Sequence, residues 1–430
     1  MTRFISFLTL ALLLVGCCSQ PDDSKQAGSY VAINQGQFIV DGEADYFVGT
    51  NFWYGAILAS QGEGGNRERL EQELDALEAM GVDNLRILVG ADGLPGVPTK
   101  IEPTLQIAPG EYNDEIFDGL DYLLSRLGER GMKAVLFLNN AWEWSGGFSQ
   151  YLMWAGEAKA PIPLVDGYPA YMEYVAGFVT NPQAQALFAD HVRYVVSRTN
   201  RYTGLKYTED PAIFSWQICN EPRAFKAEHK EALYSWISDV AKLIRSLDKN
   251  HLISTGSEGA WGCETDWELA ERIHAIPEVD YMTIHIWPYN WSWLKADDMA
   301  STIDEAIANT EEYINRHLDI AKRISKPVVI EEFGMPRDGM VYNLGTPTTF
   351  RDSYYAYIFS RIASSKAEGG LLAGCNFWGW GGYAEPEHEQ WQRGDSYCGD
   401  PAQEAQGLNS VFVGDESTID IITKANQNLK

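Results

Sequence analysis

The sequence predicts an α/β fold: an eight-stranded (β/α)8 TIM barrel with an N-terminal β-hairpin and long insertions in the loops after some strands. Two observations predict it. From about residue 30 to the C-terminal end, short apolar segments alternate with segments of helical periodicity. Polar residues gather where the apolar segments end, which is where such a barrel places its active site. No repeat, low-complexity linker or composition shift marks a second domain, so residues 30–430 are expected to form one barrel domain.

The expected elements follow in chain order. Residues 30–33 and 37–40 flank Asn34-Gln35-Gly36 and predict a hairpin that closes the bottom of the barrel. The apolar segments predict barrel strands at 46–51, 84–89, 133–140, 213–220, 252–255, 281–287, 327–332 and 374–378. Apolar residues at helical spacing predict helices at 66–80, 114–130, 183–199, 227–247, 302–324, 350–366 and 417–430. A long insertion rich in Trp and Tyr, 141–182, follows the third strand, and loops of this length are usually functional.

Composition limits the class of partner. The chain of 430 residues carries a net charge of −27, so nucleic acid and anionic membrane surfaces would repel it. Its 14 Trp, 22 Tyr and 17 Phe supply many flat apolar surfaces. Such rings often fill cores, but they also stack on sugar rings. A neutral substrate is therefore favoured.

The N-terminus predicts export. Arg3 precedes an apolar run, 4–15, that is too short to span a bilayer and is typical of a signal peptide. The run ends in a stretch that resembles a bacterial lipoprotein signal, with Leu14-Val15-Gly16 before Cys17. The resemblance implies that residues 1–16 are removed, that Cys17 is lipidated and that 17–29 form a flexible tether. We expect an outer-membrane or cell-surface location; an ordinary cleaved signal, giving a periplasmic or secreted protein, is the alternative.

Four cysteines remain beyond the signal region, and they allow three full pairings: Cys219, Cys263, Cys375 and Cys398. Cys219, beside the Asn220–Glu221 pair, is expected to be a small buried residue rather than half of a bridge. No CxxC pair or clustered His/Cys spacing suggests a metal site, and no cofactor is predicted.

Two strand ends carry carboxylates. Residues 216–223 read WQICNEPR, which places Glu221 between Asn220 and Pro222 at the end of an apolar strand. The proline is expected to hold Glu221 in an extended conformation. Residues 327–334 read PVVIEEFG, a second apolar run, ending in Glu331 and Glu332. Two carboxylates brought together at strand ends are what glycoside hydrolysis uses.

The pattern does not decide which glutamate of the second strand is used. Side chains alternate along a strand, so Glu331 and Glu332 are expected to face opposite ways, and only one can point into the mouth. Arg86, near the end of another strand, is the candidate cation that would keep Glu332 ionised.

Other residues at strand ends suit a sugar site. His285, beside Trp287, is expected to hydrogen-bond a carboxyl group or a sugar. Trp378 is followed by small residues, which would leave its indole open for stacking. The remaining tryptophans considered for the site are Trp53, Trp142, Trp144, Trp154, Trp291 and Trp293. About half of these six are expected to line a groove and the rest to pack in the core.

Seven stretches together resemble glycoside hydrolase family 5, specifically its endo-β-1,4-mannanase subfamily: GTNFWYG (49–55), NLR (84–86), AWEWSGGFSQYLMWAG (141–156), WQICNEPR, HIWPYNW, IEEFG and FWGWGG. The resemblance implies a retaining mechanism without a metal. It implies Glu221 as the acid/base and, because the family's nucleophile directly precedes Phe/Tyr-Gly, Glu332 as the nucleophile.

The same resemblance implies substrate-binding residues. Around the cleaved sugar it places Arg86, Asn220, His285 and Trp378, and on the leaving-group side Arg223. Trp53, Asn140, Trp142, Trp144 and Trp287 complete the expected substrate-binding set. Trp287 stands where the wider family has a Tyr that touches the nucleophile, and its indole N–H is the substitute donor. Asn139-Asn140 stand where many cellulases of the family carry His, in keeping with a mannanase.

The leading hypothesis is thus a retaining endo-β-1,4-mannanase that acts on mannan, glucomannan or galactomannan. Within enzymes, an exo-acting mannosidase, a β-glucanase or a transglycosylase is the alternative, since the 141–182 insertion could block one end of a groove. A catalytically inactive polysaccharide-binding lipoprotein is the alternative from another class. The oligomeric state is left open.

Overall fold

The computed structural model of the protein describes residues 29–430. The predicted signal peptide (1–16) and the lipidation site Cys17 lie outside the described residues, as does the predicted tether except for its last residue. Among the described residues, no helix has the length and apolar character needed to cross a membrane.

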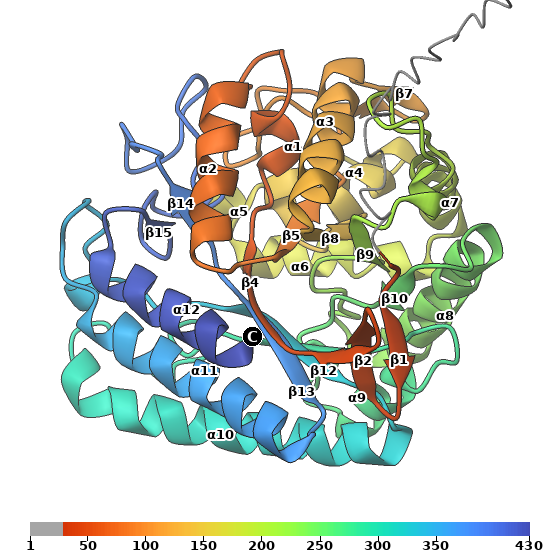
Figure 1. Cartoon of the computed structure of the whole chain (residues 1–430). Helices are drawn as coiled ribbons and strands as arrows, with labels where there is room; N and C mark the ends of the chain where they lie inside the picture. The colour runs from red at the N-terminus through yellow and green to blue at the C-terminus, as the bar shows by residue number, and fades with distance from the viewer. Residues whose placement is uncertain (1–28) are drawn as a thin grey trace, which may run out of the picture.

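Eight parallel strands form one sheet that is nearly closed into a barrel, which confirms the predicted fold (Figure 1). In space the order is β10-β9-β8-β5-β4-β13-β12-β11. At the seam between β10 and β11, the Asp280 N–H donates to the Ile253 carbonyl at 2.8 Å. The strand bounds are β4 (Phe47–Asn51), β5 (Asn84–Leu88), β8 (Lys133–Phe137), β9 (Ile213–Gln217), β10 (Leu252–Ser254), β11 (Met282–Ile286), β12 (Val328–Phe333) and β13 (Leu372–Phe377).

One principal helix follows each barrel strand and packs outside the sheet. The Asn66 side chain caps the first by accepting from the Arg69 N–H, and Gly131, in a left-handed conformation, ends the second. The last three lie side by side along one flank of the barrel (Figure 1). The helix bounds are α2 (Arg67–Ala79), α3 (Asp114–Arg130), α7 (Pro182–Val196), α8 (Lys230–Leu247), α9 (Trp267–His274), α10 (Met299–Ile324), α11 (Thr349–Glu368) and α12 (Glu416–Leu429).

The predicted hairpin closes the bottom of the barrel. Strands β1 (Ala32–Asn34) and β2 (Gln37–Val40) pair antiparallel, and a third strand that was not predicted, β3 (Glu43–Asp45), pairs with β2. Phe38 is fully buried and meets Phe214 and Tyr281 edge to face, at ring-centroid distances of 5.0 and 5.3 Å. The hairpin thus seals the end of the barrel from which the strands start.

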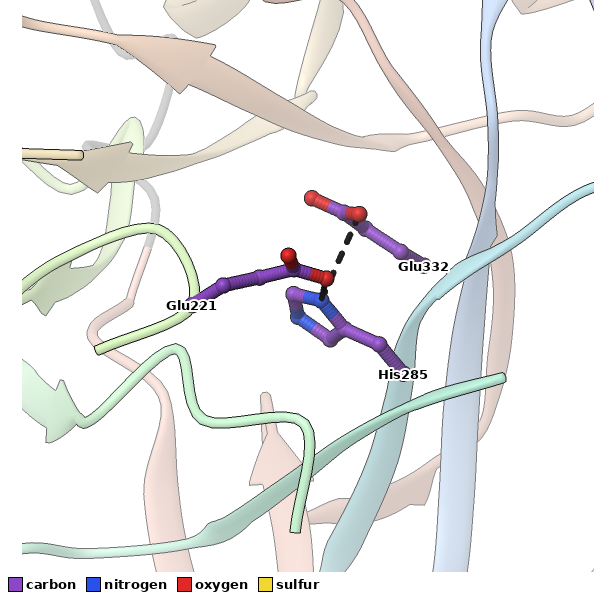
Figure 2. Close-up of side chains that lie close together, drawn as sticks. All are labelled: Glu221, His285 and Glu332. Carbon is purple, nitrogen blue, oxygen red and sulfur yellow. Dashed lines mark hydrogen bonds and ion pairs between the residues drawn. The ribbon is translucent and has the colours of Figure 1, made fainter. Parts of the chain in front are cut away.

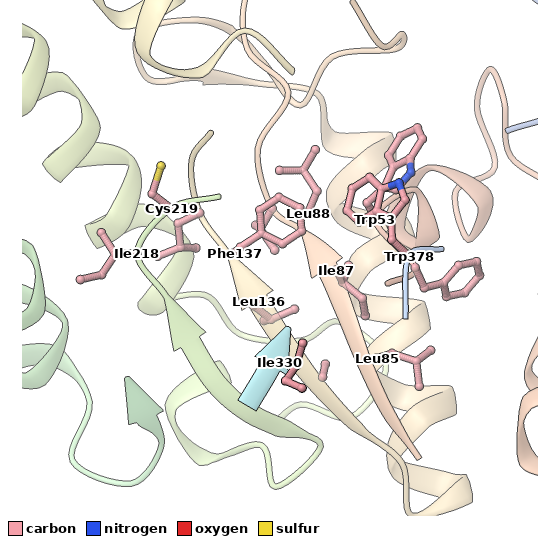
Figure 3. Close-up of a cluster of buried hydrophobic side chains, with 14 of the residues drawn as sticks. Trp53, Leu85, Ile87, Leu88, Leu136, Phe137, Ile218, Cys219, Ile330 and Trp378 are labelled. Atoms are coloured by element: carbon pink, nitrogen blue, oxygen red, sulfur yellow. The ribbon is translucent and has the colours of Figure 1, made fainter. Parts of the chain in front are cut away.

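The barrel strands are buried on both faces, as expected for a parallel sheet covered by helices. Figure 3 shows Leu85 and Ile87 of β5 beside Leu136 of β8 and Ile330 of β12. All four cysteines of the described region are buried and free, and Cys219 is the small core residue that was predicted.

The loops at the opposite end carry their own structure. The 141–182 insertion, predicted only as a loop, folds into short helices: η1 (Glu143–Ser145), α4 (Gly147–Trp154), α5 (Pro163–Asp166), α6 (Tyr168–Val175) and η2 (Phe178–Thr180). The remaining short elements are α1 (Gly55–Leu58), β6 (Gln106–Ala108), β7 (Glu111–Tyr112), η3 (Tyr207–Glu209), η4 (Ala227–His229), η5 (Asp338–Met340), β14 (Trp380–Gly382) and β15 (Val411–Phe412).

Candidate active site

A cavity of about 370 Å³ opens where the barrel strands end. That volume lies in the range of small-molecule sites. Its walls come from strand ends, from helix α6 of the insertion and from a loop near the C-terminus. The lining residues are Trp142, Trp144, Tyr168, Met172, Asn220, Glu221, Arg223, Glu258, Trp261, Trp287, Asn290, Trp291, Glu332, Trp378, Gln403 and Glu404.

Glu221 reaches the cavity through a strained backbone. Its N–H donates to the Gly256 carbonyl at 2.9 Å, which continues the hydrogen bonding of β9 with the next strand. The extended conformation predicted from Pro222 is wrong: Glu221 has φ +49° and lies in the left-handed region. For a residue other than glycine this costs about 1–3 kcal/mol and persists only where the surroundings enforce it. The contacts of the carboxylate, described below, provide that enforcement.

Strand β12 brings both of its glutamates inside the barrel. The register of β12 with β11 pairs Ile284 with Ile330 but His285 with Glu332, so Glu331 is an extra residue in a bulge. The expectation that the two glutamates face opposite ways is therefore wrong, because a bulge interrupts the alternation. Glu332 lines the cavity, whereas Glu331 lies fully buried beneath it.

The two glutamates predicted as catalytic meet in space although 111 residues separate them in the chain. Figure 2 shows the side chains of Glu221 and Glu332 lying close together, with the ring of His285 against them. The Nδ1 atom of His285 lies 2.9 Å from Glu221 Oε1 and 3.3 Å from Glu332 Oε2. The three side chains each place a polar atom within 4.8 Å of the others. Retaining glycosidases hold their two carboxyl groups about 5 Å apart, whereas inverting ones leave room for a water between them, so this close approach favours the retaining geometry.

Arg86 balances the charge of the buried carboxylates. The guanidinium is fully buried and donates from Nη1 to Glu332 Oε1 at 2.5 Å. It also donates to Gln217 Oε1 and Asn220 Oδ1, at 2.8 Å each, so its position is fixed on three sides. Glu331 lies farther off, 3.9 Å from Arg86 Nε. The predicted pairing of Arg86 with Glu332 is thus present in the structure.

These contacts set the protonation of Glu332 and His285. Burial alone would raise the pKa of Glu332, but the charges of His285 and Arg86 and their hydrogen bonds hold that pKa below its ordinary value. Burial alone would lower the pKa of His285, but Glu332 and Glu221 raise it to about 9. Glu332 is therefore ionised at neutral pH, as a nucleophile must be.

Aromatic rings line the cavity around the carboxylates. The Trp142 indole N–H donates to Glu221 Oε2 at 2.5 Å. The Trp378 ring lies edge to face between Trp144 and Trp287, with centroid distances of 6.3 and 6.0 Å. The described hydrogen bonds of Glu332 come from Arg86 and His285, so they do not involve the Trp287 indole that stands in place of the family's Tyr.

Arg223 lies on the side of the cavity next to Glu221. It forms a two-pronged ion pair with Glu258, with both N–O distances at 2.6 Å, and its guanidinium lies 5.3 Å from the centre of the Trp142 ring. Burial raises the pKa of Glu258, which Arg223 opposes. Glu258 was not predicted, because it stands in the loop three residues beyond the predicted fifth strand.

Four predicted substrate-binding residues do not line the cavity. Arg86 and His285 are buried and contact its carboxylates, as described above. The other two are Trp53 and Asn140. Trp53 is buried and donates its indole N–H to the Gly399 carbonyl at 2.9 Å; its ring packs 5.6 Å from Trp144. Asn140 is also buried, and its Oδ1 accepts from the Asn220 side chain at 3.1 Å and from the Trp142 N–H at 3.0 Å. Both residues hold the cavity wall in place from behind.

Two further lining residues, Gln403 and Glu404, come from the loop between β14 and β15. Gln403 Oε1 and Glu404 Oε2 are buried without a hydrogen-bond partner among the described residues. Burial, Asp400 and Glu332 all raise the pKa of Glu404. No strand periodicity leads to this loop, so its place at the cavity could not be predicted from the sequence.

The cluster of Glu221, His285 and Glu332 could by distance alone also offer atoms to a cation. Arg86 and the proton on His285 Nδ1 already place positive charge against the carboxylates, however. The arrangement therefore suits proton transfer by one carboxyl group and nucleophilic attack by the other.

Comparisons with known proteins agree with this geometry. The profile of the family described as GH family 5 beta-mannosidase-like matches residues 28–430. Mannan endo-1,4-beta-mannosidase 1 of Oryza sativa subsp. japonica is 28% identical over 365 residues, and the match covers 82% of this chain and 78% of the relative. The protein of the same name from Arabidopsis thaliana is 29% identical, and the match covers 81% of each chain. A mutant of the Glycoside Hydrolase Family 5 Mannosidase from Rhizomucor miehei, in complex with mannosyl-fructose, superimposes with a TM-score of 0.86 at 34% identity, covering 93% of this chain and 97% of that one.

Proposed function

Because this chain belongs to the GH family 5 beta-mannosidase-like family and is a glycoside hydrolase, we propose that it hydrolyses β-1,4-mannosidic bonds with retention of configuration. The observation that carries the proposal is the approach of Glu221 and Glu332 to within 4.8 Å at the mouth of the barrel, against a cavity walled by tryptophan. The substrates are mannan, glucomannan, galactomannan or their oligosaccharides.

The reaction takes two steps. Glu221 protonates the glycosidic oxygen while the ionised Glu332 attacks the anomeric carbon, which forms a mannosyl ester and releases the leaving group. Glu221, now deprotonated, then takes a proton from a water that attacks the ester and frees Glu332. His285 and Trp142 hold Glu221 in line for both transfers, and Arg86 holds Glu332.

The test is to compare Glu221→Gln and Glu332→Gln with the wild-type protein on mannohexaose and on an aryl mannoside. Both variants lose mannohexaose hydrolysis, by at least about 10²-fold. Glu221→Gln keeps much more activity on an aryl mannoside with an acidic phenol, since that leaving group needs no protonation, whereas Glu332→Gln loses both. Near wild-type activity of either variant on mannohexaose would overturn the assignment.

For the position of the cut, we propose that the enzyme releases mannose from a chain end. The loop that carries Gln403 and Glu404 supports this, because it lines the same cavity as Tyr168 and Met172 of helix α6. The C-terminal loop and the insertion therefore approach each other over the cavity. The unpaired oxygens of Gln403 and Glu404 suit the hydroxyls of a terminal sugar.

Internal cleavage remains the second candidate, favoured by the plant relatives, which are named mannan endo-1,4-beta-mannosidases. The early products from mannohexaose distinguish the two modes. Cleavage at a chain end gives mannose and mannopentaose first, whereas internal cleavage gives mannobiose, mannotriose and mannotetraose. A parallel assay on β-1,4-glucan oligosaccharides tests the preference for mannose.

We also propose that the chain is anchored to a membrane through a lipid on Cys17, on the basis of the Leu14-Val15-Gly16-Cys17 stretch. In a bacterial host, the full-length chain is then found in the membrane fraction and incorporates labelled fatty acid. A Cys17→Ala variant that stays in the membrane fraction with the same label would contradict the anchor.

A further inference from the structure

A second, smaller cavity of about 270 Å³ borders the catalytic one. It lies between the loop that precedes α9 and the middle of helix α10, and Trp261 lines both cavities. The other lining residues are Ala260, Thr265, Trp267, Trp293, Asn309, Glu312, Tyr313 and Arg316. Trp293 is one of the tryptophans considered for a groove in the sequence, and none of these residues takes part in the proposed reaction.

The walls of this second cavity are aromatic. The Trp261 ring stacks on Trp291 at 4.6 Å between centroids, and Trp293 meets Trp291 edge to face at 4.9 Å. Trp267 and Trp293 both pack against Tyr313, at 5.8 and 6.1 Å. Trp261, Trp267 and Trp293 keep part of their surface exposed. The rings thus form a continuous surface that leads away from the catalytic cavity.

Polar side chains of helix α10 border these aromatic rings. Glu312 and Arg316 are exposed and Asn309 is half-buried. The Arg316 guanidinium lies 3.6 Å from the centre of the Trp267 ring. Apolar faces beside amide, carboxylate and guanidinium groups are what a sugar ring needs, because its C–H face stacks while its hydroxyls hydrogen-bond.

The two cavities share a fixed wall. The Tyr313 hydroxyl donates to the carbonyl of Glu258 and accepts from the backbone N–H of Trp261 at 3.1 Å. Glu258 in turn binds Arg223, on the side of the catalytic cavity next to the acid Glu221. Trp261 therefore lies between this side of the catalytic cavity and the second cavity.

We propose that this second cavity is a distal sugar-binding subsite, which holds a mannosyl unit on the leaving-group side of a β-mannan chain during cleavage. The inference rests on the proposed function. It predicts that the enzyme favours longer chains through residues that lie outside the catalytic cavity.

The test compares kcat/KM for mannobiose and mannohexaose in the wild type, in Trp293→Ala and in the double variant Asn309→Ala/Arg316→Ala. The wild type prefers mannohexaose. Both variants lose up to about tenfold on mannohexaose, the size of one lost stacking or hydrogen-bonding contact, and keep the wild-type value on mannobiose. The double variant changes surface side chains of α10, so it keeps the test valid if Trp293→Ala misfolds. Tyr194→Ala is the matched control, since it removes an exposed ring stacked on Tyr112 elsewhere and leaves both values unchanged.

Equal losses on both substrates, an unchanged preference in the two subsite variants, or a wild type without chain-length preference would overturn the subsite. A wild type that cleaves no mannoside would instead overturn the proposed function. In that case calorimetric titration of mannohexaose decides the subsite separately: binding that the double variant weakens supports it, and absent or unchanged binding refutes it.

Discussion

At the scale of single residues, the chemistry depends on how the charges of two buried carboxylates are balanced. Glu332 is ionised because Arg86 and His285 face it, and Glu221 is held by His285 and Trp142. Leaving one partner of a buried ion pair without the other is expensive, so each of these side chains affects both stability and rate. The next two predictions concern the two cationic side chains, Arg86 and His285.

Replacing Arg86 with Met leaves Glu332 without its closest cation. Breaking a buried pair costs about 3–5 kcal/mol of unfolding free energy, measured by urea denaturation. The pKa of Glu332 also rises, so the acid limb of the kcat/KM profile moves to higher pH. Arg198→Met is the control, since Arg198 is also paired with a buried carboxylate, Asp121, and lies over a phenylalanine ring. It should destabilise the protein without moving the acid limb; movement in both variants would contradict the assignment.

His285 makes stability depend on pH in the neutral to alkaline range. Its pKa is about 9 in the folded protein and about 6.5 in the unfolded chain. Its contribution is therefore complete below pH 6.5 and is lost as pH rises towards 9, amounting to about 3 kcal/mol. Urea denaturation should show that His285→Asn differs most from wild type near pH 6 and least near pH 9.5. A difference that is constant over this range would show that His285 keeps one protonation state.

At the scale of elements, the reactive groups lie at the ends of barrel strands, and local irregularities of the backbone direct their side chains into the cavity. The bulge at Glu331 lets Glu332 reach the mouth, while Glu331 stays below and accepts from the Tyr281 hydroxyl at 2.9 Å. The left-handed backbone conformation of Glu221 likewise lets the carboxyl group of the proposed acid reach the mouth of the barrel. At the other end of the barrel, the hairpin closes the core with Phe38.

The hairpin should contribute to stability and not to catalysis. Phe38→Ala leaves a cavity among the rings of Phe47, Phe214 and Tyr281, which costs about 3–5 kcal/mol. Ile33→Ala, a half-buried position in the same hairpin, should cost clearly less. Differential scanning calorimetry measures both, and kcat on mannohexaose should stay at the wild-type value. A loss of kcat at temperatures where Phe38→Ala is folded would show that the bottom of the barrel affects the site.

The strands and part of the site could be predicted from the sequence. Apolar runs located all eight barrel strands, because a strand buried on both faces consists mostly of apolar residues. Residues at the strand ends, such as Glu221, Glu332 and His285, followed from that. The bulge at Glu331 and the φ of Glu221 could not be predicted, since both depend on contacts with neighbouring strands that local periodicity does not contain. Glu258 and Glu404 were missed for a related reason: loops bring them to the cavity.

At the scale of the whole molecule, the two ends of the barrel have different roles. The hairpin and hydrophobic core occupy one end and the interior, and the opposite end gathers the reactive groups, the insertion and the C-terminal loop around one cavity. The aromatic surface over Trp261 extends that cavity on one side. The large negative charge of the chain agrees with a neutral saccharide as substrate.

In the proposed mechanism, Glu332 attacks the sugar while Glu221 serves as the acid. Incubation with a 2-deoxy-2-fluoro-mannosyl fluoride, followed by protease digestion and tandem mass spectrometry, tests it most directly, since the fluorine slows hydrolysis of the mannosyl ester. We expect a single fluoromannosyl adduct, located on Glu332. An adduct on the adjacent Glu331 or on Glu221, or inactivation without any adduct, would contradict it.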